Sequence, residues 1–148
     1  VMRDLYSRIY VEQEHIPTRF FDGVPELLND LRAASRLLAV ATGKSRRGLD
    51  RVMNILAVEN LFHGTRCADE TRGKPEPDMV LELLDSLRVH PAQAVVVGDS
   101  HFDLEMAARA GVDGIGVGWG AQAAETLAQL SGTHCVQDLG ALRKALGF

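Results

Sequence analysis

The sequence predicts an α/β domain in which helices cover both faces of a parallel sheet, and three observations support this fold class. Helical and strand-like patterns alternate along the chain, as they do in βαβ architectures. Apolar runs at residues 37–42 and 94–97 are short and end next to Gly or Thr-Gly, which is typical of strands buried on both faces. At 148 residues, 46% of them apolar, the chain can build one domain with a sizeable core.

The expected elements follow from hydrophobic spacing and from turn residues. Apolar side chains recur at helical intervals, and the stripe of Leu27, Leu28 and Leu31 is assigned to the core rather than to any site. Helices are expected at residues 4–14, 25–34, 46–56, 78–87, 102–110, 121–129 and 139–146. Strands are expected at residues 37–42, 65–68, 94–97, 114–117 and 135–136.

The segment 94–111, AVVVGDSHFDLEMAARAG, is the most informative part of the chain. Its strand breaks at Gly98 and presents Asp99 at the carboxyl end of the sheet, where parallel sheets bind ligands. Asp103 follows about one helical turn later and can point the same way. Such a pair suits Mg²⁺, which takes one or two carboxylates together with waters and substrate phosphate. Ser100 to Asp103 equally fits a helix-capping box, and this segment alone does not decide between the two interpretations.

A second candidate segment, Thr42-Gly43-Lys44-Ser45, lies between an expected strand and the next helix. A hydroxyl, a backbone amide freed by Gly and a helix N-terminus can together cradle a phosphate. The alternative is an ordinary strand-to-helix turn capped by Ser45 or Thr42, and for this tetrapeptide by itself that alternative is favoured.

A third candidate segment, Gly73-Lys74-Pro75-Glu76-Pro77, holds a lysine between Gly and two prolines ahead of a predicted helix. Restricted φ angles on both sides of Glu76 make Lys74 less mobile than an ordinary loop lysine. Pro77 suits the first helical position. Held rigidly, the ammonium group can neutralise a phosphoryl oxygen.

In this order and spacing, Thr42, Lys74 and the run Gly98-Asp99-Ser100-x-x-Asp103 resemble motifs of a known family. They are similar to the second, third and fourth motifs of the haloacid dehalogenase-like (HAD) hydrolase superfamily, in its phosphoglycolate phosphatase-like branch. The resemblance extends from about Phe21 to Leu146. It implies a Rossmann-like HAD core, with a small phosphomonoester as substrate, an aspartyl-phosphate intermediate and Mg²⁺ as cofactor.

The resemblance also implies a role for each matched residue. Asp99 would hold Mg²⁺ directly, and Asp103 would bind the metal through water or orient Lys74. Lys74 would counter the charge of nucleophile and phosphate in the transition state. Contacts to the substrate phosphate are expected from Thr42, Gly43, Lys44 and Lys74.

One motif of the family is missing from the sequence. The family's first motif, Asp-x-Asp-x-Thr on a strand, supplies the nucleophile and the general acid/base, and no Asp-x-Asp pair occurs in these residues. Phe20-Phe21-Asp22-Gly23 has one Asp, follows Pro17 and is interpreted as a turn before a helix. In the family the missing strand lies between the strands that end in Thr42 and Asp99. The sheet is therefore expected to lack its N-terminal central strand, and the gap to close, stay unpaired or receive a strand from another chain.

The chain opens on Val1 rather than Met, close to the expected helix 4–14, and so looks like the C-terminal piece of a longer protein. Residues 1–18 are interpreted as the remnant of a cap domain, ending in its last helix, and residues 19–148 as the hydrolase core. The chain alone is expected to be inactive and only marginally stable. The substrate is not identified, because specificity in this family lies largely in the cap.

Two other functions are weighed against this one. Gly116-Val117-Gly118-Trp119-Gly120-Ala121 fits G-x-G-x-x-A, and Asp138 follows 22 residues after Gly116, as in a dinucleotide-binding oxidoreductase domain. That fingerprint normally opens its domain, whereas here it lies in the last third of the chain. A non-catalytic receiver-like module also carries acidic residues, Thr and Lys at strand ends, but its acidic pair comes first, and here Thr42 does.

The composition argues against several classes of partner. The formal net charge of −4, with interspersed Lys and Arg, predicts neither nucleic acid nor an anionic membrane as a partner. Apolar runs fall well short of the ~20 residues that span a bilayer, and the N-terminus lacks a signal-peptide pattern, so a cytoplasmic location is expected. Cys67 and Cys135 are expected to be reduced thiols, and the histidines show no zinc-ligand spacing.

Overall fold

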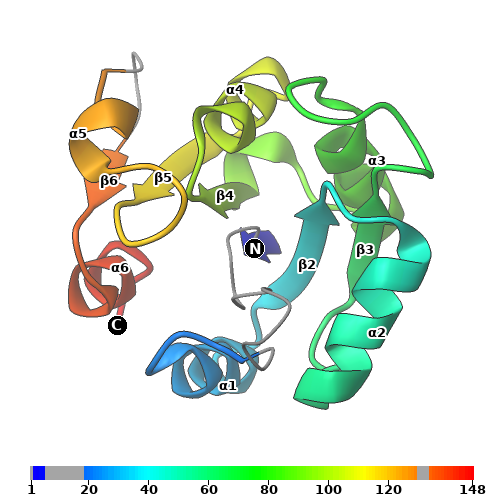
Figure 1. Cartoon of the computed structure of the whole chain (residues 1–148), viewed down its shortest axis with the longest axis horizontal. Helices are drawn as coiled ribbons and strands as arrows, with labels where there is room; N and C mark the ends of the chain where they lie inside the picture. The colour runs from blue at the N-terminus through cyan, green and yellow to red at the C-terminus, as the bar shows by residue number, and fades with distance from the viewer. Residues whose placement is uncertain (1, 6–18, 130–133) are drawn as a thin grey trace.

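Parallel strands form one six-stranded sheet, in the order β3-β2-β1-β4-β5-β6, in the computed structural model, which describes residues 2–5, 19–129 and 134–148 (Figure 1). The strands are β1 (Met2–Leu5), β2 (Leu37–Thr42), β3 (Gly64–Cys67), β4 (Ala94–Gly98), β5 (Asp113–Val117) and β6 (His134–Val136). The helices are α1 (Val24–Ala33), α2 (Arg46–Leu56), α3 (Asp78–Leu87), α4 (His101–Arg109), α5 (Ala124–Leu127) and α6 (Leu139–Ala145), with a 3₁₀ turn, η1 (Pro91–Gln93).

Helices cover both faces of this sheet, as the sequence predicts. On β4, Val95 and Val97 belong to a buried cluster with α1 and α6. Ala94 and Val96 point to the other face and join a cluster with α3 and α4. All five residues of β4 are buried, because successive side chains of a strand face opposite layers and both layers are covered.

Most element bounds predicted from the sequence are confirmed to within one residue, for helices and strands alike. The main exception is the helix expected at 121–129, because α5 extends only from Ala124 to Leu127. The backbone amide of Ala121 donates to Asp99 Oδ2, and that of Gln122 donates to the Asp99 carbonyl. These long-range hydrogen bonds hold the residues before Ala123 outside the helix.

The central gap expected between the strands that end in Thr42 and Asp99 is filled by the N-terminal segment of this same chain, which none of the three expected outcomes foresaw. β1 lies between β2 and β4, pairing Met2 with Leu37 on one side and with Ala94 on the other. Unpaired N–H and C=O groups on two neighbouring strands are costly, and a short N-terminal segment satisfies both rows at once. The predicted helix 4–14 is accordingly wrong at Asp4 and Leu5, and its residues 6–14 lie outside the described residues. The assignment of residues 1–18 to a cap remnant stays a prediction.

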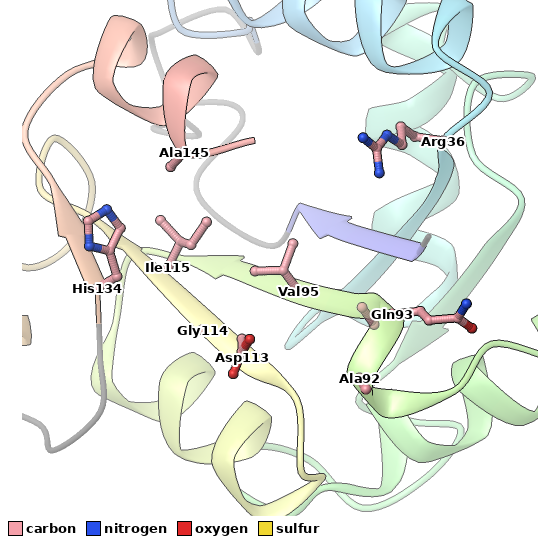
Figure 2. Close-up of a pocket in the computed structure, with 10 residues that line it drawn as sticks. Arg36, Ala92, Gln93, Val95, Asp113, Gly114, Ile115, His134 and Ala145 are labelled. Carbon is pink, nitrogen blue, oxygen red and sulfur yellow. The ribbon is translucent and has the colours of Figure 1, made fainter. Parts of the chain in front are cut away.

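A cavity of about 390 Å³ opens at the amino ends of the strands, at the edge opposite to the candidate residues (Figure 2). Its lining includes Val95 and Ile115 from the sheet, with Arg36, Asp113 and His134 at the rim. No residue predicted for catalysis, phosphate or metal lines it.

Candidate phosphate and metal site

The predicted site residues lie at the carboxyl edge of the sheet, on neighbouring strands and loops. Thr42 is the last residue of β2, and Asp99 directly follows β4. Lys74 lies on the loop between β3 and α3, and Asp103 lies in the first turn of α4. The end of β2, the loop after β3, and the loop and helix after β4 therefore lie at one edge of the sheet (Figure 1).

The two carboxylate oxygens of Asp103 connect the Lys74 loop, the Asp99 backbone and the Ser100 cap of α4. Lys74 Nζ lies 2.6 Å from Oδ1, and the Lys74 and Asp103 side chains are only 8% and 0% exposed. Oδ2 accepts from the Asp99 amide at 3.1 Å, from the Ser100 amide at 3.1 Å and from the Ser100 hydroxyl at 3.0 Å. The capping box predicted as an alternative is present, and its Asp103 also links Lys74 to the backbone amide of Asp99.

The electrostatics of Asp103 reflect its burial. Loss of hydration raises the pKa of the Asp103 carboxyl, whereas the charge and hydrogen bond of Lys74 and the Ser100 hydroxyl oppose that shift. The net direction is upward. Leaving such a carboxylate buried without Lys74 would be costly, so the two side chains fix each other's position.

Asp99 is held by the loop that follows β5. Its side chain is 2% exposed, and Oδ2 accepts from the Ala121 amide at 3.0 Å. A Cβ built on Gly120 would lie 2.3 Å from Asp99 Oδ2, and one built on Gly98 would lie 2.3 Å from Asp103 Cβ. Both glycines are therefore required by close approach to the two acids.

The sequence analysis missed the contribution of this loop. Gln122 Oε1 accepts from the His101 amide at 2.6 Å, and its contact with His101 Nδ1 at 3.2 Å orients the ring. The glycine-rich segment after β5 was the available signal. The sequence pattern there fits a dinucleotide fingerprint at 116–121 and predicts a helix at 121–129, and nothing in it pairs Ala121 or Gln122 with β4.

The donor set fits a magnesium ion through Asp99 more directly than through Asp103. Asp99 places a buried carboxylate at the sheet edge, the kind of oxygen ligand that Mg²⁺ takes singly or in pairs. Both oxygens of Asp103 already accept hydrogen bonds from Lys74, Ser100 and the Asp99 amide. Of the two roles expected for Asp103, orienting Lys74 is the one that its contacts match.

The Thr42-Gly43-Lys44 segment is ordered by its own hydrogen bonds. Thr42 is 4% exposed, and its hydroxyl accepts from the Lys44 amide at 3.1 Å. Ser45 caps α2 by accepting from the Gly48 amide, as the turn interpretation predicts. A Cβ on Gly48 would lie 3.6 Å from Lys44 Cβ, so the lysine stem starts beside α2. Burial, followed by the nearby Arg51 charge, lowers the pKa of Lys44.

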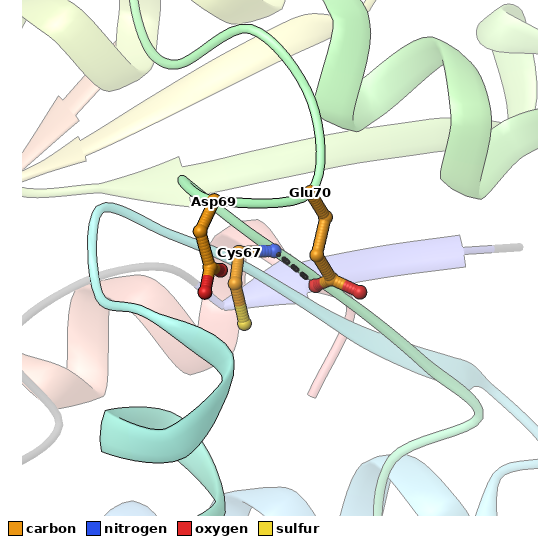
Figure 3. A group of neighbouring side chains, drawn as sticks. All are labelled: Cys67, Asp69 and Glu70. Atoms are coloured by element: carbon orange, nitrogen blue, oxygen red, sulfur yellow. Dashed lines mark hydrogen bonds between the residues drawn. The ribbon is translucent and has the colours of Figure 1, made fainter.

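A different acidic group, Cys67, Asp69 and Glu70, lies at the carboxyl end of β3 (Figure 3). It is the one set of three clustered His, Cys, Asp or Glu side chains found in the described part of the chain. Glu70 Oε1 accepts from the Cys67 amide at 2.8 Å and lies 2.7 Å from Arg46, and Asp69 Oδ1 accepts from the Arg46 amide at 2.9 Å. Burial, with a hydrogen bond to Glu70, raises the pKa of the Cys67 thiol to about 12, so without a bound metal this side chain is a neutral thiol near neutral pH.

The geometry does not favour the dinucleotide interpretation. The fingerprint needs a helix directly after the glycines, but α5 starts at Ala124 and has four residues. Asp138, expected to hold a ribose hydroxyl, is the N-cap of α6, and its Oδ1 accepts from the Ala141 amide at 2.7 Å.

Among the described residues, no helix is both long and apolar enough to cross a membrane.

Comparison with known proteins finds curated relatives along most of the chain. Tyrosine-protein kinase PtkA of Mycobacterium tuberculosis (strain ATCC 25618 / H37Rv) is 37% identical over 131 residues, which are 86% of this chain and 45% of that kinase. Phosphoglycolate phosphatase of Psychrobacter arcticus is 29% identical over 143 residues, which are 96% of this chain and 60% of that enzyme. The chain thus spans about half the length of these curated relatives.

A solved structure extends the likeness to the fold. D,D-heptose 1.7-bisphosphate phosphatase from B. bronchiseptica, complexed with magnesium and phosphate, superposes with a TM-score of 0.79 over 98% of this chain and 97% of that one, at 22% identity. A model of the haloacid dehalogenase-like hydrolase family matches residues 1–117. This chain therefore belongs to the haloacid dehalogenase-like hydrolase family.

Proposed function

We propose that the protein to which these residues belong hydrolyses small phosphomonoesters through an aspartyl-phosphate, with phosphoglycolate as the substrate that its relatives suggest. One observation carries the proposal: Asp103 ties a buried ammonium, Lys74, to the backbone of a buried carboxylate, Asp99, at the carboxyl edge of the sheet. Family membership supports the same reaction class.

The nucleophile and the acid/base Asp form no Asp-x-Asp pair within these 148 residues. They would come from further residues of the protein, on a strand that takes the central place now held by β1. A strand from another chain would likewise have to displace Met2–Leu5, so complementation stays a prediction. On this proposal the 148 residues alone lack the attacking group and are inactive.

The residues of this chain would bind and orient the phosphate. A nucleophile carboxylate oxygen forms a bond to phosphorus while the ester P–O bond breaks, and the leaving oxygen takes a proton from the acid/base Asp. Lys74, fixed by Asp103, would neutralise charge on the transferring phosphoryl group, and Thr42 and the Gly43 amide would donate to its oxygens. Water then cleaves the acyl-phosphate. Mg²⁺, held by Asp99, would supply further positive charge to the phosphate when bound.

The test compares the 148-residue chain with a longer protein that includes the residues preceding Val1. Each is assayed on a panel of phosphomonoesters with Mg²⁺ or with EDTA. Activity is expected only in the longer protein with Mg²⁺, and Lys74→Ala should lower kcat by about 10²- to 10³-fold. Lys144→Ala, an exposed lysine of α6, is the matched control and should retain full activity. An unimpaired Lys74→Ala enzyme, or turnover by the 148 residues alone, would overturn the proposal.

The identity to a tyrosine-protein kinase supports a second candidate, transfer of a phosphoryl group from a nucleoside triphosphate to a tyrosine hydroxyl. The same phosphate-binding edge could serve both reactions, because the acceptor oxygen is the only difference in the final step. Incubating the longer protein with labelled ATP and a tyrosine-containing copolymer distinguishes them. Label on the copolymer favours transfer, and label only in free phosphate favours hydrolysis.

A further inference from the structure

We propose that Glu76 and Arg109 are positioning residues for Lys74, acting as an exposed clamp that holds the lysine loop against α4. This inference rests on the proposed function, since it explains how the site lysine is kept in place. Neither residue is among those matched to phosphate or metal binding, although Glu76 belongs to the candidate segment that carries Lys74, and neither is buried.

The loop that carries Lys74 is held near the lysine by a turn, in which the Glu76 amide donates to the Gly73 carbonyl at 3.0 Å. It runs from the end of β3 to the start of α3 without regular structure. A Cβ built on Gly73 would meet nothing within 4 Å, so the residue before Lys74 has open space beside it. The Lys74–Asp103 contact at 2.6 Å fixes the tip of the lysine, at the end of a flexible four-carbon stem, and so constrains the loop backbone less directly than a contact made closer to it.

The clamp gives the loop a second attachment to the same helix. Glu76 Oε1 lies 3.1 Å from Arg109 NH1, and Arg109 lies on α4 six residues after Asp103. The loop therefore contacts α4 once inside the protein, through Lys74, and once at the surface, through Glu76. Two attachments on one rigid helix restrict both the translation and the rotation of the segment between them.

Further ion pairs hold the two clamp residues in place. Arg109 NH2 lies 2.6 Å from Glu105 Oε1, one helical turn away, which fixes the direction of the guanidinium. On the loop side, Arg72 Nε lies 2.9 Å from Asp78 Oδ2, and Arg72 NH1 lies 3.9 Å from Glu76 Oε2. These ion pairs form one network that alternates in sign and joins the Lys74 loop to α4, in the order Asp78, Arg72, Glu76, Arg109 and Glu105.

Exposed ion pairs contribute little to global stability, so this network should be visible in the position of Lys74 more than in the unfolding transition. A misplacement of about 1 Å in a catalytic constellation can cost about 10²-fold in rate. Weakening the clamp while Asp103 still holds the ammonium should displace Lys74 less than that. We therefore expect a loss of roughly tenfold in kcat with little change in KM.

The experiment uses Glu76→Gln, Arg109→Ala and the double variant, with Arg143→Ala as the matched control. Arg143 contacts Asp30 through an equally exposed ion pair that joins α6 to α1, far along the chain from Lys74. In the 148-residue chain, the ¹⁵N resonance of the Lys74 ammonium and the exchange of its protons report on the buried contact. In the longer protein with Mg²⁺, kcat and KM report on the reaction.

Each clamp variant should speed proton exchange of the Lys74 ammonium and lower kcat by roughly tenfold, whereas Arg143→Ala should change neither. The double variant should lose no more than a single one, because each change removes the same interaction. Arg109→Lys should restore part of the loss, since a lysine can reach Glu76 but cannot also bind Glu105 in the guanidinium geometry. An unchanged Lys74 resonance and unchanged kcat in Glu76→Gln would overturn the clamp. Altered Lys74 exchange in a longer protein that hydrolyses no phosphomonoester would uphold the clamp and overturn the proposed function.

Discussion

Two acidic groups lie at strand ends of the same sheet edge, and each contains a basic partner. After β4, Asp103 pairs with Lys74, and their side chains are 0% and 8% exposed. After β3, Glu70 pairs with Arg46, and their side chains are 34% and 36% exposed. The first pair has been taken out of water, whereas the second remains in contact with it.

The difference teaches that burial, more than the number of carboxylates, marks a candidate site. A buried charged pair is retained at a cost in hydration, and that cost is offset only by specific partners in fixed geometry. An exposed pair needs no such arrangement and contributes little. The β3 group contains three potential metal ligands, yet its contacts are those of a loop fastened to α2.

The largest expected effect separates the two groups by stability. Asp103→Ala leaves the Lys74 ammonium buried without its partner, which should cost about 3–5 kcal/mol in the free energy of unfolding. Glu70→Ala removes an exposed partner and should cost about 1 kcal/mol or less. Urea unfolding of both variants measures the difference.

A double variant controls for the burial argument. Lys74→Met with Asp103→Leu replaces the pair by apolar side chains and should recover part of the stability lost in Asp103→Ala. Equal losses in Asp103→Ala and Glu70→Ala would show that burial does not distinguish the groups.

The two groups should also respond to pH with opposite sign. Burial raises the pKa of the Asp103 carboxyl above its ordinary 3.8, despite the opposing charge of Lys74. The folded state therefore binds this proton more tightly than the unfolded state does. The contribution of Asp103 to stability falls as pH rises from 3.8 through the pKa of the folded state. For Glu70, burial is outweighed by hydrogen bonds from Arg46 and Cys67, which lower its pKa below 4.5; its contribution is present above that value and lost as pH falls through the folded pKa.

Carboxyl ¹³C titrations of the folded chain between about pH 3 and about pH 7 test this. The Asp103 midpoint should lie above 3.8 and the Glu70 midpoint below 4.5. Asp103→Asn and Glu70→Gln identify the two resonances. Shifts in the same direction would contradict the contrast.

The smallest expected effect concerns the buried thiol of Cys67, in the group after β3. A pKa of about 12 for Cys67, against an ordinary 9.0, leaves roughly a thousandfold less thiolate near neutral pH. Cys135→Ser, which retains Cys67, should therefore react slowly with a disulfide reagent until the chain is unfolded, and should show no cadmium–thiolate absorbance. Rapid modification in the folded state, or a cadmium band, would revive a metal role for this group.

Much of the fold could be predicted because it depends on local signals. Ser45 and Ser100 cap α2 and α4, Gly98 ends β4, and the bounds near these residues are predicted well. β1 could not be predicted, because a four-residue strand with two charged residues has no apolar pattern, and its formation depends on rows of backbone groups in β2 and β4.

The site likewise has a part that short motifs predict and a part that depends on contacts between distant segments. The grouping of Lys74, Asp99 and Asp103 was predicted from two short motifs, and Lys74 Nζ lies 2.6 Å from Asp103 Oδ1. The support from Ala121 and Gln122 was not, because it depends on contacts between loops separated by about twenty residues in sequence. The acid-to-glycine contacts at Gly98 and Gly120 were also invisible, since a missing Cβ leaves no chemical signature in a sequence.

The capping box of α4 has a consequence for how this protein can change. Asp103 Oδ2 accepts from the Ser100 amide and from the Asp99 amide, and Asp103 Oδ1 accepts from Lys74. Folding of the helix and geometry of the site thus depend on one side chain. A library of variants screened only for thermal stability should keep Asp103, and with it the placement of Lys74 and Asp99, even if no member is ever tested for chemistry.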